Sequence, residues 1–159
     1  MMIAQDIGAM IHGELARIPE TITAGAGNDG VEVNGPAIDL LAVSNQGKRK
    51  FHSAKVMIPF SATLGAAETL TVAFNLQTAS DSGFTTDVAD LAPAFASAVV
   101  QDGGAGGTFN GVVELSIPLE QANQYVRLQS TADLSAANTD TVDVAAVLVM
   151  GGVDEAPVV

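Results

Sequence analysis

Apolar and polar residues alternate with a period of two along most of the chain after residue 31. In residues 70–78, the large apolar side chains of Leu70, Val72, Phe74 and Leu76 are separated by small or polar ones. This spacing puts the apolar side chains on one face and predicts an antiparallel strand with one buried face. The same alternation predicts strands at residues 56–60, 113–117, 126–130 and 142–148, with weaker segments at 37–43 and 95–99.

Segments rich in Gly, Ser, Asn and Asp separate these predicted strands. They lie at residues 44–47, 80–83, 102–107 and 136–140, and their composition is typical of turns and loops. Seven or eight short strands with turns between them predict an all-β protein. We therefore expect an antiparallel, jelly-roll-like β-sandwich of about eight strands. Greek-key and immunoglobulin-like wiring are alternatives that periodicity alone does not separate.

The first twenty residues follow a different pattern. Their apolar residues recur at intervals of three and four, at Ile3, Ile7, Met10, Ile11, Leu15 and Ile18. This period predicts a short helix with one apolar stripe, ended by Pro19. The Gly-rich residues 23–30 predict a linker. We expect residues 1–30 to form an N-terminal arm with its linker, residues 31–152 the sandwich, and residues 153–159 a C-terminal tail.

Composition and charge narrow the classes of function. The 159 residues include no cysteine, which excludes disulfides, thiolate metal sites and cysteine nucleophiles. Residues 56–159 carry one basic residue against twelve acidic ones, so this part of the chain repels phosphates and is not expected to bind nucleic acid. The N-terminus lacks the features of a secretory signal, and no apolar run is long enough to span a bilayer. We expect a protein made in a cytoplasm, with no membrane partner.

Four of the six basic residues lie within one segment of eight, at Lys48, Arg49, Lys50 and Lys55. Such a cluster has three interpretations. The most common is a solvated strand end, the second is a docking patch for an acidic protein surface, and the third is a contact with nucleic acid.

No pattern of residues predicts catalysis. His12 lies in the predicted arm and His52 in the basic segment, so the two histidines are not expected to form a catalytic pair. The glycine-rich residues 103–107 lack the following lysine of a phosphate-binding loop and predict a hairpin tip. The acidic residues of the loops lack the spacing of a calcium-binding loop: Asp81, Asp87, Asp90, Asp133, Asp140 and Asp143. We therefore expect no enzyme, cofactor or metal site.

Several short sequence segments, in their order along the chain, resemble small structural proteins of tailed bacteriophages. The segments are residues 33–40, 69–85, 114–118 and 124–128, with a closing strand at 142–150. The chain resembles the jelly-roll cement, or decoration, proteins of phage capsids over residues 31–152. The resemblance implies a homotrimer on the outer capsid surface of the virion, where it stabilises contacts between major capsid subunits after synthesis in the host cytoplasm.

The predicted arm lies outside this resemblance. An amphipathic segment outside a domain has to bury its apolar stripe. Ile3, Ile7, Met10, Ile11 and Leu15 are therefore expected either to cover a neighbouring subunit or to fold back on their own sandwich. Lys48, Arg49, Lys50 and Lys55 are the second candidate interface, facing an acidic surface of the capsid.

A binding module is the alternative function. In this interpretation the sandwich belongs to a phage tail, baseplate or fibre and recognises a glycan on the host surface. Glycan sites commonly contain aromatic platforms, and only Phe84, Phe109 and Tyr125 lie near predicted loops. The composition therefore favours the cement protein over the glycan-binding module.

Overall fold

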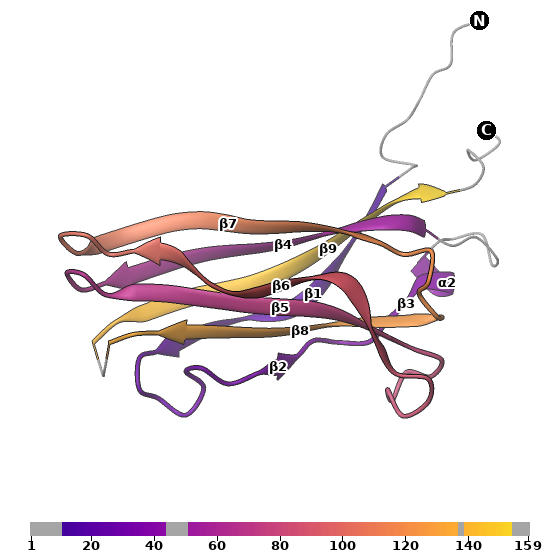
Figure 1. Ribbon diagram of the computed structural model, residues 1–159, viewed down its shortest axis with the longest axis horizontal. Coiled ribbons are helices and arrows are strands. Elements are labelled where there is room, and N and C mark those ends of the chain that lie inside the picture. Colours follow the sequence, from indigo (N-terminus) through magenta and orange to yellow (C-terminus); the bar gives the residue numbers. More distant parts are fainter. Residues whose placement is uncertain (1–10, 44–50, 137–138, 154–159) are drawn as a thin grey trace, which may run out of the picture.

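Two antiparallel sheets pack face to face in the computed structural model, which describes residues 11–43, 51–136 and 139–153 (Figure 1). Sheet A contains, in spatial order, β1 (Ile11–Thr23), β9 (Thr141–Val153), β4 (Phe51–Leu64) and β7 (Gly107–Pro118). Sheet B contains β2 (Val33–Asn34), β8 (Tyr125–Leu134), β5 (Thr69–Ala79) and β6 (Ala89–Asp102), and β3 (Ile38–Asp39) also pairs with β8. A single-turn helix, α2 (Leu40–Val43), follows β3.

The connections between the sheets are those of a jelly roll. The chain passes from β1 in sheet A to β2 and β3 in sheet B, then to β4 in sheet A, β5 and β6 in sheet B, β7 in sheet A, β8 in sheet B and β9 in sheet A. Eight strand positions arranged in this way form two interlocked Greek keys, and β2 and β3 together fill one position. The predicted fold class is confirmed.

The core lies between the sheets and is built by the period-two alternation. In β5, Leu70, Val72, Phe74 and Leu76 are buried, whereas the residues between them are half-exposed. The ring of Phe74 stacks on that of Phe95 from β6, with 5.0 Å between their centroids. The predicted strands at 56–60, 113–117, 126–130 and 142–148 all lie within observed strands of the same alternation.

The predicted N-terminal helix is wrong for the residues that the structure describes. Residues 11–23 form β1, which pairs with β9 from Ile11↔Gly151 to Thr23↔Thr141. Pro19 lies inside this strand, next to two shifts of register. Residues 11–23 therefore belong to the sandwich, and not to an arm outside it.

The weaker predictions are confirmed in part. Residues 37–43 contain β3 and then α2, because the Asp39 carboxylate accepts hydrogen bonds from the N–H groups of Leu41 (2.9 Å) and Ala42 (3.2 Å) and begins the helix. Residues 95–99 lie within the longer β6. Residues 103–106 form a turn between β6 and β7, but these strands belong to different sheets, so the turn connects the two sheets and is not the predicted tip of a hairpin. The predicted loop at 44–47 lies outside the described residues.

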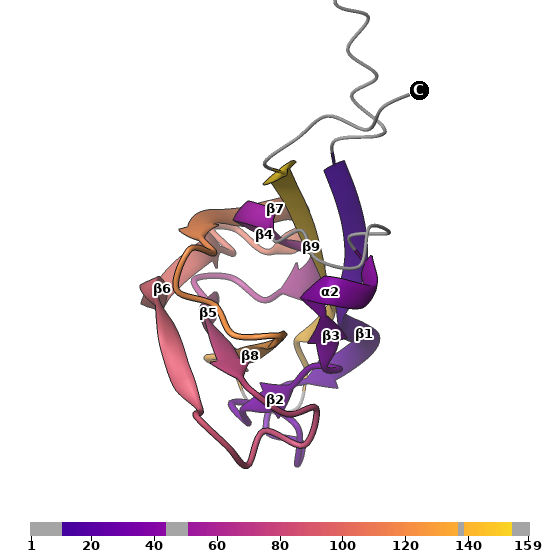
Figure 2. The same ribbon diagram turned by 90° about the vertical axis from the view of Figure 1, so that its right-hand side faces the viewer.

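One side of the sandwich is closed by contacts between β1 and sheet B. Arg17 is 1% exposed, donates a 3.0 Å hydrogen bond to the hydroxyl of Ser130 on β8, and pairs with Glu20. Next to it, a Cβ atom added at Gly35 would lie 1.8 Å from the carbonyl oxygen of Ala16. Figure 2 shows β6 on the opposite side of the sandwich from β1. The β1 side is therefore held by backbone packing and by a buried arginine.

Candidate functional site

The outer face of sheet A is apolar over much of its area. In β9, the inward residues from Val142 to Met150 are buried, but the outward Ala145, Val147 and Val149 are apolar as well. The solvated face of an antiparallel sheet is ordinarily polar. A strand that is apolar on both faces is therefore expected to bury both of them.

The neighbouring strands extend this apolar area. Leu15 of β1 and Met57 of β4 both pair with Val147, and Pro59 pairs with Val112 of β7. The side chains of Ile11, Leu15 and Val112 are 49%, 44% and 51% exposed. We call this area the apolar outer patch, which consists of Ile11, Leu15, Met57, Pro59, Val112, Ala145, Val147 and Val149.

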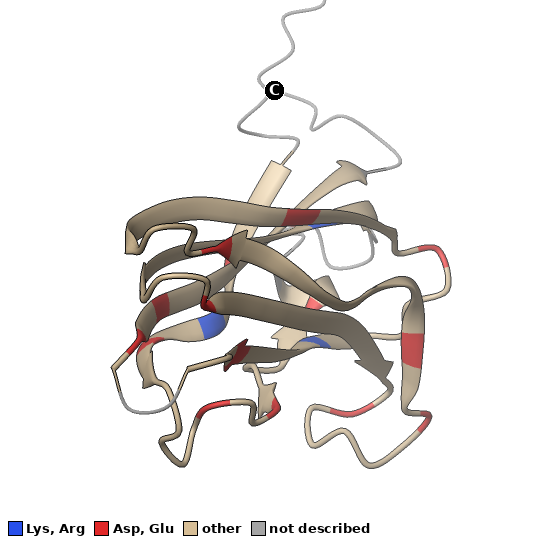
Figure 3. Cartoon of the chain, turned by 60° about the vertical axis from the view of Figure 1, so that its left-hand side comes forward, with Lys and Arg blue, Asp and Glu red and all other residues tan. Residues whose placement is uncertain are grey.

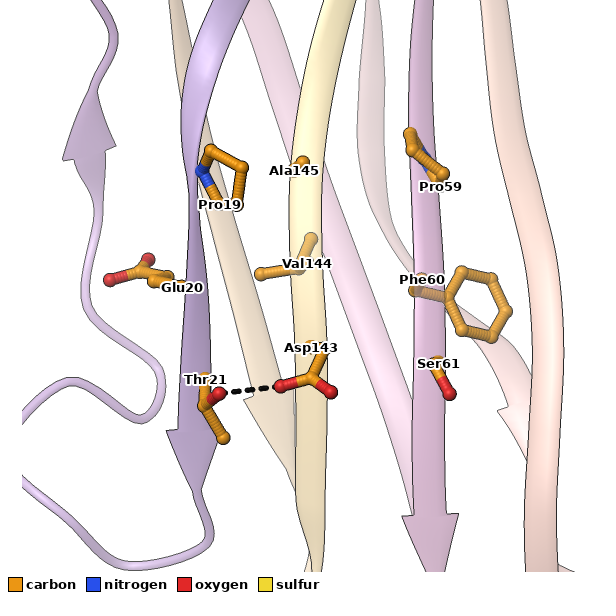
Figure 4. Close-up of a pocket in the computed structure, with 9 residues that line it drawn as sticks. All are labelled: Pro19, Glu20, Thr21, Pro59, Phe60, Ser61, Asp143, Val144 and Ala145. Carbon is orange, nitrogen blue, oxygen red and sulfur yellow. Dashed lines mark hydrogen bonds between the residues drawn. The ribbon is translucent and has the colours of Figure 1, made fainter.

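Polar side chains border the patch. Lys55 of β4 pairs with Glu114 of β7 at 2.6 Å, beside Val149. On the other side of the patch the hydroxyl of Thr21 donates a hydrogen bond to Asp143, where Pro19, Pro59, Ser61 and Ala145 line a shallow depression (Figure 4). Beyond it, the hydroxyls of Thr63 and Thr108 lie 3.1 Å apart. An apolar centre with a polar rim is the usual composition of a protein interface.

The outer face of sheet B is more polar over its central strands than the outer face of sheet A. Most outward residues of its two central strands, β5 and β8, are polar, and several are hydrogen-bonded to one another across the strands, whereas the edge strand β6 exposes Val99 (59%) and several alanines. Arg127 donates two hydrogen bonds to the side-chain oxygen of Gln77, at 3.0 and 2.9 Å, and Gln129 donates to Asn34 at 2.9 Å. Figure 3 shows most acidic residues in loops and near strand ends. The two central strands of sheet B thus present a more polar outer face than the central strands of sheet A.

The structure brings together three of the residues predicted from the sequence. Ile11 and Leu15 lie in the apolar outer patch, and Lys55 lies at its rim, on the same face of sheet A. The other predicted interface residues lie outside the described residues: Ile3, Ile7, Met10, Lys48, Arg49 and Lys50. Lys55 is paired with an acidic neighbour of its own chain, so its charge is partly compensated.

The remaining patch residues were missed by the sequence analysis. The signal that could have found them is the run from Val144 to Met150, in which the residues of both parities are apolar. A strand with one solvated face alternates, and this one does not. Residues 56–60 of β4 contain the same signal, since all five are apolar, whereas β7 does not, because Asn110, Glu114 and Ser116 lie on its outward face.

A polar cluster lies near the end of sheet B, around the start of β8. Burial acts to raise the pKa of the Asp39 carboxyl, but hydrogen bonds from Gln124 and from the N–H groups of Ala42 and Leu41 outweigh it, and the pKa lies below its usual value. The pKa of Tyr125 is raised by burial and by the neighbouring Asp39 carboxylate. Arg127 lies 4.2 Å above the ring of Phe84. These contacts fix the loops against β8.

The described residues contain no group of three or more His, Cys, Asp or Glu that could hold a metal ion. His12 bonds to the carboxylate of Glu14 at 2.6 Å, next to the ring of Phe51. Within the same residues, no helix has the length and hydropathy needed to cross a bilayer.

Comparison with known proteins gives structural similarity alone. No protein-family model and no curated protein sequence matches the chain. Among solved structures, the chain is similar to the infectious bursal virus protein of the T=1 particles, with 13% identity, a TM-score of 0.42, and coverage of 88% of this chain and 31% of that one. It is similar to a chain of turnip yellow mosaic virus with 14% identity, a TM-score of 0.34, and coverage of 93% and 84%. The chain spans less than a third of the length of the first of these relatives.

Proposed function

We propose that this chain is a structural virion protein that binds the outside of a phage capsid and stabilises contacts between major capsid subunits. The observation that carries the proposal is the apolar outer patch on sheet A, set against the polar outward residues of the two central strands of sheet B, β5 and β8. A patch of this kind on a folded domain marks a binding surface. The proposed partner, the major capsid protein, follows from the resemblance of residues 31–152 to phage cement proteins.

The physical character of the patch fits attachment to another protein. Burying exposed apolar surface stabilises a complex by about 25 cal/mol per Å². Leu15, Val147 and Met57 form a continuous row across three strands, so a partner that covers the row excludes water from all of them. The Lys55–Glu114 pair at the rim is expected to contribute orientation more than affinity.

The charge of the molecule is consistent with the same role. The net charge of −12 disfavours contact with nucleic acid and keeps the unattached protein in solution. The segment with Lys48, Arg49 and Lys50 directly precedes β4, and its contact with an acidic capsid surface stays a prediction. The homotrimer and the position on the capsid surface also stay predictions.

The glycan-binding alternative finds little support among the aromatic side chains. Sugar rings stack on exposed aromatic faces, but Phe84 is 9% exposed and has Arg127 over its ring. Phe109 packs partly against the core. Tyr125 is half-buried beside Gln124. These three aromatics do not form a shared platform with exposed faces.

A binding experiment tests the proposal. Capsids prepared without this protein are mixed with it, and binding is measured by cosedimentation. We expect saturable binding, and we expect Leu15→Glu to weaken it about ten- to a hundredfold, because a charge at the centre of an apolar contact is left unpaired. Leu15 is 44% exposed, so the substitution is compatible with folding.

The matched control is Asn75→Glu, which adds the same charge to the outer face of sheet B. We expect it to bind as the natural protein does. Absence of saturable binding by the natural protein would contradict the proposal. Equal loss in both variants would mean that overall charge, and not the patch, governs attachment.

A further inference from the structure

The four lateral edges of the two sheets differ in how well they are protected against pairing with another strand. β1 has two register shifts and contains Pro19, β2 and β3 have two residues each, and β6 has three register shifts. Short edges, bulges and prolines are the devices by which proteins prevent edge-to-edge pairing. β7 has none of these devices between Gly107 and Ile117, and it pairs with β4 over twelve residues without a shift.

The direction of the backbone groups of β7 follows from Pro59, which has no N–H. β4 pairs with β9 at Met57↔Val147 and at Phe60↔Val144, but Ile58 and Pro59 between them form no pair with β9. Pairing with β7 continues through all four residues. The missing donor is therefore on the β9 side, so Pro59 faces β9, while Ile58 and Phe60 bond to Val113 and Gly111 of β7.

Backbone groups of successive strand residues point to alternate sides. Because Gly111 and Val113 bond to β4, the even-numbered residues of β7 direct their N–H and C=O groups away from the sheet. These residues are Thr108, Asn110, Val112, Glu114 and Ser116. Among the described strands β7 pairs with β4 alone, so this edge presents five donors and five acceptors.

Charge gives this edge little protection. Glu114 is the only charged residue of β7, and its carboxylate lies 2.6 Å from the ammonium group of Lys55 on the neighbouring strand. A charged side chain on an edge strand prevents pairing because it would be desolvated without a partner. Here the partner comes from within the same chain.

We propose that β7 pairs with β7 of a second copy, antiparallel, about a twofold axis through Val112. In this register Val112 lies opposite Val112 of the other copy, Asn110 opposite Glu114, and Thr108 opposite Ser116. All five outward-bonding residues of each strand then find partners, which gives five pairs with two hydrogen bonds each.

The neighbouring registers are poorer. An axis through Glu114 would place the two Glu114 carboxylates opposite each other, and like charges in this position are destabilising. An axis through Val113 would place Thr108 opposite Pro118, which has no N–H to donate. The axis through Val112 also places Phe109 opposite Leu115 on the inner face.

The pairing joins the two four-stranded sheets A into one sheet of eight strands. Because the twofold axis is perpendicular to the sheet, the apolar outer patches of both copies lie on the same side, with Val112 of each copy at the seam. The contact goes beyond the proposed function and does not depend on it. Combined with the expected homotrimer, it would link trimers in pairs.

A cysteine experiment tests the register, since the chain has no cysteine of its own. Residues of a hydrogen-bonded antiparallel pair have Cα atoms about 5.5 Å apart, which is within the range of a disulfide. We expect Val112→Cys to form a covalent dimer on mild oxidation. Ser116→Cys is the control on the same strand, because its two copies would lie about 27 Å apart, eight residues along the strand.

The solution mass of the natural protein gives a second measurement. We expect an even multiple of 16.1 kDa by light scattering, and half that mass for Val112→Pro, whose lost N–H is one that faces away from β4. Val112→Thr keeps the N–H and should keep the larger mass. An odd multiple for the natural protein, or equal crosslinking of Val112→Cys and Ser116→Cys, would overturn the proposal. Neither result bears on capsid binding, which the Leu15→Glu variant tests separately.

Discussion

At the scale of single residues, Asp81 has the most hydrogen bonds of the acidic loop residues. Its carboxylate accepts bonds from the N–H groups of Gly83 (3.0 Å), Thr85 (3.0 Å) and Thr86 (2.7 Å), and from the Thr85 hydroxyl (3.0 Å). Burial acts to raise the pKa of Asp81, but these bonds to the charged form outweigh it and lower the pKa below 3.8. The loop after β5 is therefore folded around an ionised side chain.

This arrangement predicts a pH-dependent loss of stability in Asp81→Asn. A carboxyl whose pKa is lowered by folding contributes stability that is complete above its unfolded pKa and is lost as the pH falls through the folded pKa. We expect Asp81→Asn to have a lower Tm than the natural protein at pH 7, and the difference to shrink below about pH 4. The measurement is thermal unfolding at several pH values. Glu120→Gln, on an exposed residue, is the control, and a difference that does not change with pH would contradict the argument.

At the scale of elements, regular strands were predictable and bulged ones were not. β5 alternates strictly, and the buried residues of β9 recur at every second position, so the positions of both strands follow from the sequence. In β1 the shifts near Arg17 and Glu20 put Ala16 and Arg17 both inside, and expose Ile18 and Pro19 together. The shift between Leu15 and Arg17 leaves Leu15 and Ile18 both exposed at a spacing of three, which is typical of a helix. Ile11 and Leu15 were expected at an interface from that helical spacing, although they lie on a strand.

The outer patch was only partly predictable for a related reason. Leu15, Met57 and Val112 are distant in the sequence and meet only through the register of β1, β9, β4 and β7. Register is a three-dimensional property that depends on turns and on bulges. The apolar runs in β9 and at residues 56–60 of β4 are the parts of the patch that the sequence alone contains.

The packing of β1 against the β2–β3 connection predicts a large effect of Gly35→Ala. The added Cβ would lie 1.8 Å from a backbone oxygen of β1, which cannot move without disturbing the pairing of β1 with β9. We expect a loss of about 3 kcal/mol in the free energy of unfolding, at the upper end of the usual cost of overpacking. Gly13→Ala is the control, because nothing lies within 4 Å of its added Cβ, and we expect a change within about 0.5 kcal/mol. Chemical denaturation measures both, and similar values for the two variants would contradict the close approach.

At the scale of the whole molecule, the proposed attraction between the β7 edges of two copies is opposed by repulsion between their net negative charges. Each copy has a net charge of −12, and acidic residues lie at both ends of the sandwich (Figure 3). The proposed β7 contact itself is formed by backbone hydrogen bonds, with Glu114 already paired to Lys55. Long-range repulsion between two acidic bodies is screened by salt, whereas backbone hydrogen bonds at a buried seam are not.

Salt is therefore expected to strengthen the association of two copies. The Debye length falls from about 30 Å at 10 mM to about 8 Å at 150 mM ionic strength, so most of the repulsion between the two bodies disappears over this range. We expect the Kd of the pair, measured by sedimentation equilibrium, to fall several-fold between these concentrations. Val112→Pro should remain at the lower mass in both. Weaker association at high salt would show that ion pairs between the copies hold the contact. If salt strengthened the association of Val112→Pro as much as that of the natural protein, the contact would lie elsewhere than at β7.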